Sequence, residues 1–179
     1  MNPHRAAGHT AVMASRHEAV DSLDFFPTPP WATRALCAHV IPNECQGTAW
    51  EPAAGEGHMA EVLREFFPVV HASDVHDYGK RYAVGSFVGV GLDVAAAPSN
   101  VNWVITNPPF NLACEFAERA LDTAHIGVAL LVRTAWLESK DRYERLFSVR
   151  PPSTVALFVE RVPMVKALTK PNDIERYAP

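Results

Sequence analysis

Cysteine and long hydrophobic runs are both scarce in this 179-residue chain. Its three cysteines, Cys37, Cys45 and Cys114, are an odd number without a Cys-x-x-Cys pair, so the sequence predicts neither a disulfide framework nor a zinc site. No stretch approaches the ~20 consecutive apolar residues of a membrane span. Residues 1–21 also lack the apolar core and cleavage site of a secretory signal peptide. We therefore expect a cytoplasmic protein without a membrane partner.

A disorder-promoting composition is absent as well. Hydrophobic residues make up 48% of the chain and charged residues 20%, which is typical of a globular protein with a buried core. The length matches one domain, and we expect a flexible arm over residues 1–23 and a single domain over residues 24–179, with no separate target-recognition domain. Residues 1–132 carry a net charge of −7 and residues 133–179 carry +3, so the last part can form a local basic surface on an acidic body.

Short apolar runs alternate with amphipathic stretches along the chain, which predicts an α/β fold with parallel central strands. Helices are expected over residues 31–40, 59–67, 112–123 and 139–147, and strands over residues 48–51, 69–73, 86–90, 103–106, 126–132 and 154–159. The strand signal at residues 86–90 is the weakest of these.

Polar side chains stand where successive strands are expected to end, namely at Glu51, Asp74, Asp93 and Asn107. Open parallel sheets bind ligands at this edge. The first strand is followed by a turn that contains Gly55 and Gly57, and Asp74 is placed to accept hydrogen bonds from ribose hydroxyls. The pattern indicates a nucleoside cofactor, although a tight strand-to-helix turn without a ligand would use the same glycines.

The tetrapeptide Asn107-Pro108-Pro109-Phe110 directly follows the strand expected at residues 103–106. Taken alone, these residues are also typical of a rigid turn. An asparagine amide oxygen and a proline carbonyl held rigidly together can accept both protons of one exocyclic amino group, and an aromatic side chain can stack on a planar ring. With the glycine turn nearby, the tetrapeptide predicts a pocket for an amino group.

In these motifs the sequence resembles the class I S-adenosylmethionine-dependent methyltransferases, and among them the phage and bacterial DNA N6-adenine methyltransferases. Residues 24–29 are similar to their N-terminal cofactor motif, residues 51–57 to their methionine-binding loop and residues 107–110 to their catalytic tetrapeptide. The resemblance covers residues 24–162 and implies a Rossmann-like three-layer sandwich with a mostly parallel sheet. We expect its C-terminal antiparallel hairpin to be incomplete, because only one clear late strand precedes the end of the chain.

The resemblance implies S-adenosylmethionine as the cofactor and no metal. Its cofactor-binding residues would be Phe26, Thr28, Glu51, Pro52, Ala53, Gly55, Gly57, Asp74, Val75, Asp93 and Asn107. Among them Thr28 would contact the methionyl carboxylate, Glu51 and the glycine turn would hold the methionyl part, Asp74 would bind the ribose and Asp93 the adenine. Val75 would pack on the cofactor ring. A metal site at residues 71–77 is not expected, because alternate residues of a strand face opposite sides.

The catalytic residues implied by the resemblance are Asn107, Pro108 and Phe110. Asn107 and the Pro108 carbonyl would polarise the acceptor amine, and Phe110 would stack on a flipped base. The predicted activity is methyl transfer to adenine N6 in DNA. An RNA adenine, a protein glutamine or a cofactor-binding relative without catalysis are the alternatives. Phosphates would be contacted by Arg133, Lys140, Arg142, Arg145, Arg161, Lys166 and Lys170.

Overall fold

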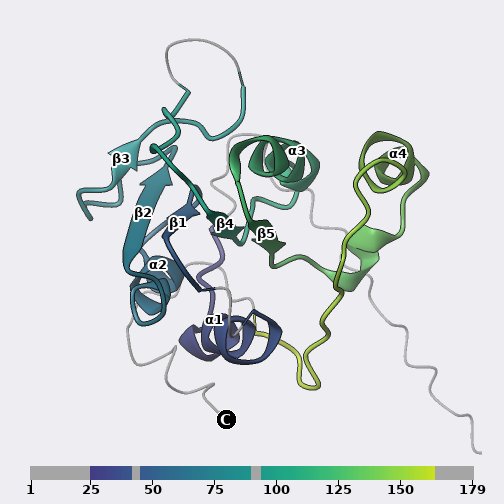
Figure 1. Ribbon diagram of the computed structural model, residues 1–179, viewed down its shortest axis with the longest axis horizontal. Helices are drawn as coiled ribbons and strands as arrows, with labels where there is room; N and C mark the ends of the chain where they lie inside the picture. The colour runs from purple at the N-terminus through teal and green to yellow at the C-terminus, as the bar shows by residue number, and fades with distance from the viewer. Residues whose placement is uncertain (1–24, 42–44, 90–93, 164–179) are drawn as a thin grey trace, which may run out of the picture.

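A five-stranded parallel sheet forms the centre of the protein (Figure 1). The computed structural model describes residues 25–41, 45–89 and 94–163. Within them the strand order is β3-β2-β1-β4-β5. The strands are β1 (Thr48–Glu51), β2 (Val69–Asp74), β3 (Ala83–Val84), β4 (Trp103–Thr106) and β5 (Gly127–Leu130). Every pair of neighbouring strands is parallel, so each connection must cross over a face of the sheet.

Helices cover both faces of this sheet, which makes the fold a three-layer sandwich. The helical segments are α1 (Pro30–Ala35), η1 (Leu36–Val40), α2 (His58–Leu63), α3 (Ala113–Thr123), η2 (Thr134–Leu137), α4 (Lys140–Arg142) and η3 (Tyr143–Phe147). α1 and α2 lie on one face and α3 lies on the opposite face (Figure 1). In the described part of the chain, none of these helices is long and apolar enough to cross a membrane.

Two apolar clusters fill the space between the sheet and its helices. On the face covered by α1 and α2, Leu63 packs with Ala49 and Trp103. On the face covered by α3, Phe116 packs with Trp50. The neighbouring residues Ala49 and Trp50 thus point to opposite faces, and both are buried, as expected for a central strand of a parallel sheet.

The register of the strands brings their carboxyl ends to one edge of the sheet. β1 pairs with β2 so that Glu51 lies beside Ala72. β2 ends at Asp74, and β4 ends immediately before Asn107. Polar residues that are far apart in the sequence therefore meet at this edge, as the strand pattern predicted.

The predicted α/β class and the order of the central elements are confirmed. Strands expected at residues 48–51 and 103–106 have the observed bounds, while β2 and β5 differ from expectation only at their ends. The helix patterns at residues 31–40, 112–123 and 139–147 are confirmed as α1 with η1, as α3, and as α4 with η3. Local periodicity was sufficient for the first two because each has a buried face, whereas residues 139–147 bury only Leu146.

The helix expected over residues 59–67 ends earlier than its pattern indicated, at Leu63. In the next turn the Phe66 backbone N–H donates to the Leu63 carbonyl three residues back, which is a tighter turn than an α-helix makes. Phe67 remains buried in the core, so the apolar pattern of this segment extends beyond the end of the helix.

The strand expected over residues 154–159 is wrong. These residues form no strand, and Val159 is fully exposed. An apolar run is not sufficient for a strand, because a strand also needs a partner edge. Phe158 instead packs edge-on against Trp31 of α1, with 5.3 Å between the ring centroids. Among the described residues no antiparallel strand follows β5, and the expected arm at residues 1–23 lies outside them.

The weak strand expected at residues 86–90 is also wrong. Residues 86–89 are described, and they form no strand beyond an isolated bridge between Ser86 and Val94. The edge strand of the sheet is β3, which precedes that stretch and is only two residues long. Gly89 interrupts the segment and Gly85 precedes it, and glycine disfavours a regular strand.

Ser73 provides a test of the core. Its hydroxyl lies in β2, is buried, and accepts the indole N–H of Trp50 at 2.9 Å. Ser73→Ala should leave that N–H buried without an acceptor and lower the free energy of unfolding by about 1 to 3 kcal/mol. Urea unfolding measures the difference. Ser148→Ala, which removes a surface hydroxyl bonded to the Glu144 carbonyl, should change it by less than ~0.5 kcal/mol; equal losses would contradict the assignment.

Candidate functional site

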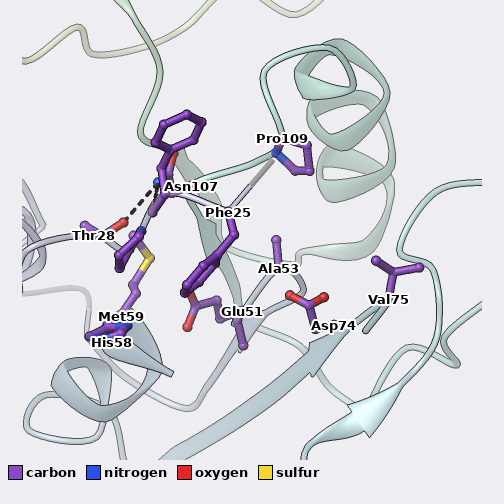
Figure 2. Close-up of a pocket in the computed structure, with 13 residues that line it drawn as sticks. Phe25, Thr28, Glu51, Ala53, His58, Met59, Asp74, Val75, Asn107 and Pro109 are labelled. Carbon is purple, nitrogen blue, oxygen red and sulfur yellow. Dashed lines mark hydrogen bonds between the residues drawn. The ribbon is translucent and has the colours of Figure 1, made fainter. Parts of the chain in front are cut away.

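A pocket lies at the carboxyl edge of the sheet, where β1, β2 and β4 end (Figure 2). Its cavity volume is about 70 Å³. The walls come from the segment before α1, the turn after β1, the start of α2, the end of β2 and the loop after β4. The lining residues are Phe25, Phe26, Pro27, Thr28, Glu51, Ala53, Ala54, His58, Met59, Asp74, Val75, Asn107 and Pro109.

The structure brings most of the sequence-predicted residues to this pocket. Those that line it are Phe26, Thr28, Glu51, Ala53, Asp74, Val75 and Asn107. Those that adjoin it without lining it are Pro52, Gly55, Gly57, Pro108 and Phe110. Asp93, Lys166 and Lys170 lie outside the described residues. Within the described ranges, no group of three or more His, Cys, Asp or Glu side chains could hold a metal ion.

Glu51 places a buried carboxyl at the end of β1. Only 3% of the residue is exposed, and the Ala60 backbone N–H donates a hydrogen bond to it. Its Oε2 atom is buried and has no hydrogen-bond partner among the described residues. Burial raises the pKa of this carboxyl well above its usual range, and the nearby Asp74 carboxylate adds to the rise. The site therefore fits a hydrogen-bond donor, above all a cationic one, from a ligand.

Asp74 fixes the glycine turn from the neighbouring strand. Its Oδ2 accepts the Gly55 backbone N–H at 2.8 Å, and its Oδ1 accepts the His76 backbone N–H at 3.0 Å. Gly55 and Gly57 have φ values of 52° and 88°, in the left-handed region that glycine adopts without strain. Each carboxylate oxygen has more than one acceptor position, so Asp74 can hold the turn and still accept ligand hydroxyls.

The ring of Phe25 fills the space that Gly55 leaves open. A Cβ atom at Gly55 would lie 2.2 Å from Cε2 of Phe25. The same ring packs against Tyr78 with 5.0 Å between centroids, and burial raises the pKa of Tyr78 to about 12. Figure 2 shows Phe25 between Asn107 and Asp74. The glycine permits a close approach to the backbone, and the group that approaches is an aromatic side chain of the chain itself.

Asn107 connects the loop after β4 to the segment before α1. Its Nδ2 donates to the Phe26 carbonyl at 3.0 Å and to the Thr28 hydroxyl at 3.2 Å, the second of which is drawn in Figure 2. A carbonyl can only accept, so these bonds fix which branch of the amide carries the N–H groups. Pro108 is fully buried behind it. The amide oxygen is therefore held in one orientation at the pocket.

Phe110 is not among the residues that line the pocket, and it belongs to an aromatic pair. Its ring stacks on that of Phe26, with centroids 5.1 Å apart and planes 29° apart. The Arg133 guanidinium carbon lies 4.1 Å from the Phe110 ring centroid, which is within the range of a cation–π contact. The side chain predicted to stack on an acceptor ring thus stacks on groups of the chain in this structure.

His58 and Met59 line the pocket although the sequence analysis gave them no role. They are the first two residues of α2, directly after the glycine turn. Burial lowers the pKa of His58, which favours its uncharged form. Their position immediately after the turn was the signal that could have identified them. Phe25 and Pro109 were quoted within the motifs but were not assigned to the site.

Three of the five described residues that were expected to contact phosphates have partners within the protein. Arg145 pairs with Glu118 at 3.0 Å, and also approaches two further carboxylates. Lys140 pairs with Glu144 at 3.5 Å. The side chain of Arg142 donates to backbone carbonyls of the preceding turn. Carboxylates therefore neutralise Arg145 and Lys140, whereas Arg142 is held by neutral backbone groups.

A wider groove of about 450 Å³ adjoins the pocket and shares Val75 with it. Its other lining residues are Ala83, Val84, Gly85, Val94, Ala95 and Ala96. The Val75 and Val84 side chains are 60% and 59% exposed. Small and apolar walls of this kind suit a planar ring better than a charged group.

Comparisons with known proteins support the fold. No protein-family model matches the chain, and no curated protein sequence matches it. The solved structure of a proposed class I S-adenosylmethionine-dependent methyltransferase from Listeria monocytogenes is similar, with a TM-score of 0.52 and 15% identity over 72% of this chain and 52% of that one. A proposed RNA methyltransferase from Pyrococcus horikoshii has a TM-score of 0.46 and 17% identity over 67% of this chain and 70% of that one.

The likeness to the Listeria structure confirms the predicted Rossmann-like fold of the class I methyltransferases. The match spans about half of the length of that protein. Similarity at this level of identity shows the fold, whereas chemistry has to be argued from the site.

Glu51→Gln should stabilise the protein at neutral pH, because it replaces a buried ionisable group by a neutral one of the same shape. A carboxyl with a raised pKa in the folded state stabilises the fold fully below its unfolded pKa of ~4.3 and loses this contribution as the pH rises through the raised value. The variant should therefore exceed the wild type by about 1 to 3 kcal/mol at pH 7, with the difference shrinking towards pH 4.

Urea unfolding at several pH values measures this difference. Glu160→Gln is the matched control, because Glu160 is exposed and its replacement should leave the pH profile unchanged. A Glu51→Gln variant that is less stable than the wild type at pH 7 would contradict the burial argument.

Proposed function

We propose that this chain is an S-adenosylmethionine-dependent methyltransferase that transfers a methyl group to an exocyclic amine. The observation that carries the proposal is the convergence of Glu51, Asp74 and Asn107 in one pocket. Together they offer an acceptor for an ammonium group, an acceptor for ribose hydroxyls and an oriented amide beside two prolines. The fold shared with the proposed methyltransferase from Listeria is compatible with this proposal.

The donor and acceptor groups of the pocket fit this cofactor. The buried Oε2 of Glu51 suits the methionyl ammonium group, and Asp74 suits the ribose. The apolar groove beside Val75 suits the adenine ring. The cavity of about 70 Å³ is smaller than the ~300 Å³ at the lower end of small-molecule sites, so Phe25 must move off Gly55 before the whole cofactor can bind.

When bound, the cofactor supplies a sulfonium-linked methyl group that a nitrogen lone pair can attack directly. Asn107 and the Pro108 carbonyl accept hydrogen bonds from the amine, which favours a pyramidal nitrogen and stabilises the positive charge that develops on it. The bond from Asn107 to the Phe26 carbonyl orients the amide before the acceptor arrives. Thr28 accepts from Asn107 and keeps its own hydroxyl proton to donate to the methionyl carboxylate.

We infer adenine N6 in DNA as the acceptor. Phe110, three residues after Asn107, provides an aromatic surface for a planar base, and a base inside a duplex would have to be flipped to reach it. Sequence-independent contacts to phosphates would hold the polymer. Adenine in RNA and glutamine in a protein carry amines that the same amide could accept. The residues needed for this activity are proposed to lie in one domain over residues 24–179.

Cofactor binding should depend on the charge of Glu51. Its pairing with an ammonium group requires the ionised carboxylate, and its pKa is raised by burial, so affinity for S-adenosylhomocysteine should fall as the pH is lowered through that raised value. Glu51→Gln should bind about 10- to 100-fold more weakly at pH 8 and should lose this pH dependence. Titration calorimetry measures both, and equal affinities for the two proteins at pH 8 would exclude the assignment.

Methyl transfer should depend on Asn107. Asn107→Ala should lower the single-turnover rate at saturating cofactor by about 100- to 1,000-fold, because it removes an acceptor that acts on the amine in the transition state. Its affinity for S-adenosylhomocysteine should fall much less, because that loss comes only from the lost hydrogen bond to Thr28. The assay follows labelled methyl groups from the cofactor into DNA, RNA and protein in parallel.

The matched control is Asn111→Ala, in the same loop at an exposed position, which should transfer at close to the wild-type rate. Wild-type transfer to RNA or protein alone would replace DNA as the acceptor. Cofactor binding without transfer to any polymer would indicate a cofactor-binding protein instead.

A further inference from the structure

Arg133 covers the ring that the proposed acceptor would use. Its guanidinium lies 4.1 Å from the centroid of the Phe110 ring, and Phe26 stacks on the same ring at 5.1 Å. A planar base that stacks on Phe110 at either of these contacts must take the place of the group already there. The two contacts differ in how firmly they are held.

Phe26 is held in place by its surroundings. The residue is 9% exposed, and its backbone carbonyl accepts the Asn107 amide, so its displacement would also disturb the proposed catalytic asparagine. Arg133 is exposed, and a cation–π contact at an exposed position contributes only about 0.5 to 1 kcal/mol. The guanidinium is therefore the group that a base can displace.

Arg133 has no carboxylate partner in the part of the chain that the structure describes. Arg145 and Arg150, by contrast, pair with Glu118 and Asp122 at 3.0 and 2.6 Å. Arg133 also has a fixed backbone: its carbonyl accepts the Trp136 backbone N–H at the start of η2. A displaced guanidinium thus remains close to the ring and free to pair with an anion.

We propose that Arg133 protects the stacking surface of Phe110 in the absence of substrate, and that it moves to a backbone phosphate next to the target when a nucleic-acid base takes its place. This inference rests on the proposed function and identifies Arg133 as a positioning residue for that reaction. The phosphate replaces the ring as the partner of the guanidinium, in the geometry that arginine provides for bidentate phosphate contacts. The exchange couples stacking of the base to neutralisation of the charge.

The proposal makes opposite predictions for two ligands of Arg133→Gln. Adenosine, which has no phosphate, should bind about two- to fivefold more tightly to the variant, because the base no longer competes with a guanidinium. A single-stranded oligonucleotide should bind about two- to fivefold more weakly. The negative slope of log affinity against log salt should become shallower by about 0.7, as for one lost phosphate contact. Both titrations use protein saturated with S-adenosylhomocysteine, so that adenosine cannot enter the cofactor pocket. NMR titration follows adenosine, and fluorescence anisotropy follows the oligonucleotide.

Two further variants control the experiment. Arg150→Gln removes an exposed arginine that pairs with Asp122, and it should leave both affinities and the salt slope unchanged. Arg133→Lys should preserve the salt slope, since it keeps the charge. Adenosine and oligonucleotide affinities that change in the same direction in Arg133→Gln, or do not change, would overturn the proposal.

The proposed function is tested separately by the wild type. If the wild type binds S-adenosylhomocysteine and methylates nucleic acid while Arg133→Gln behaves like it towards both ligands, only the role of Arg133 is wrong. If the wild type does not bind S-adenosylhomocysteine, or methylates protein alone, the role of Arg133 is overturned together with the nucleic-acid acceptor.

Discussion

The side-chain amide of Asn107 holds the two halves of the candidate site together. Its hydrogen bonds to Phe26 and Thr28 join parts of the chain that are 81 and 79 residues apart. Neither partner belongs to the sheet, so the segment before α1 is placed at the sheet edge by this contact and by the ring pair of Phe26 and Phe110. An amide constrained from one side presents its oxygen in a fixed direction, which lowers the reorganisation that binding of an amine would otherwise require.

The two carboxyl groups of the site are stabilised to different degrees. Asp74 accepts two backbone N–H groups and fixes the turn at Gly55, so its charge supports the local backbone. Glu51 is more deeply buried, and one of its oxygens has no partner in the described part of the chain. A half-satisfied buried carboxyl weakens the fold. Glu51 lies at the end of a central strand, where a bound ligand can offset the stability that its buried carboxyl costs. Functional sites often reduce the stability of a fold in this way.

The sequence predicted those parts of the fold that depend on local pattern. The strands at residues 48–51 and 103–106 have short apolar runs bounded by polar residues, and both are buried in the sheet. Parallel connection then brings their carboxyl ends together, so the meeting of Glu51, Asp74 and Asn107 followed from topology. The run at residues 154–159 has equally apolar residues but no partner edge, and its failure shows that pattern cannot supply pairing.

Tertiary contacts decide which side chain covers the space beside Gly55 and the ring face of Phe110. The sequence alone does not identify that side chain. A left-handed glycine indicates open space beside the backbone, and at Gly55 the space is filled by Phe25. An aromatic residue after the two prolines indicates an exposed ring face, and at Phe110 the face is covered by Arg133. In both places a side chain of the protein covers the surface for which the sequence predicted a ligand. Such a surface is unfavourable to leave open to water, so the chain covers it with its own side chains, and a ligand has to compete with them for it.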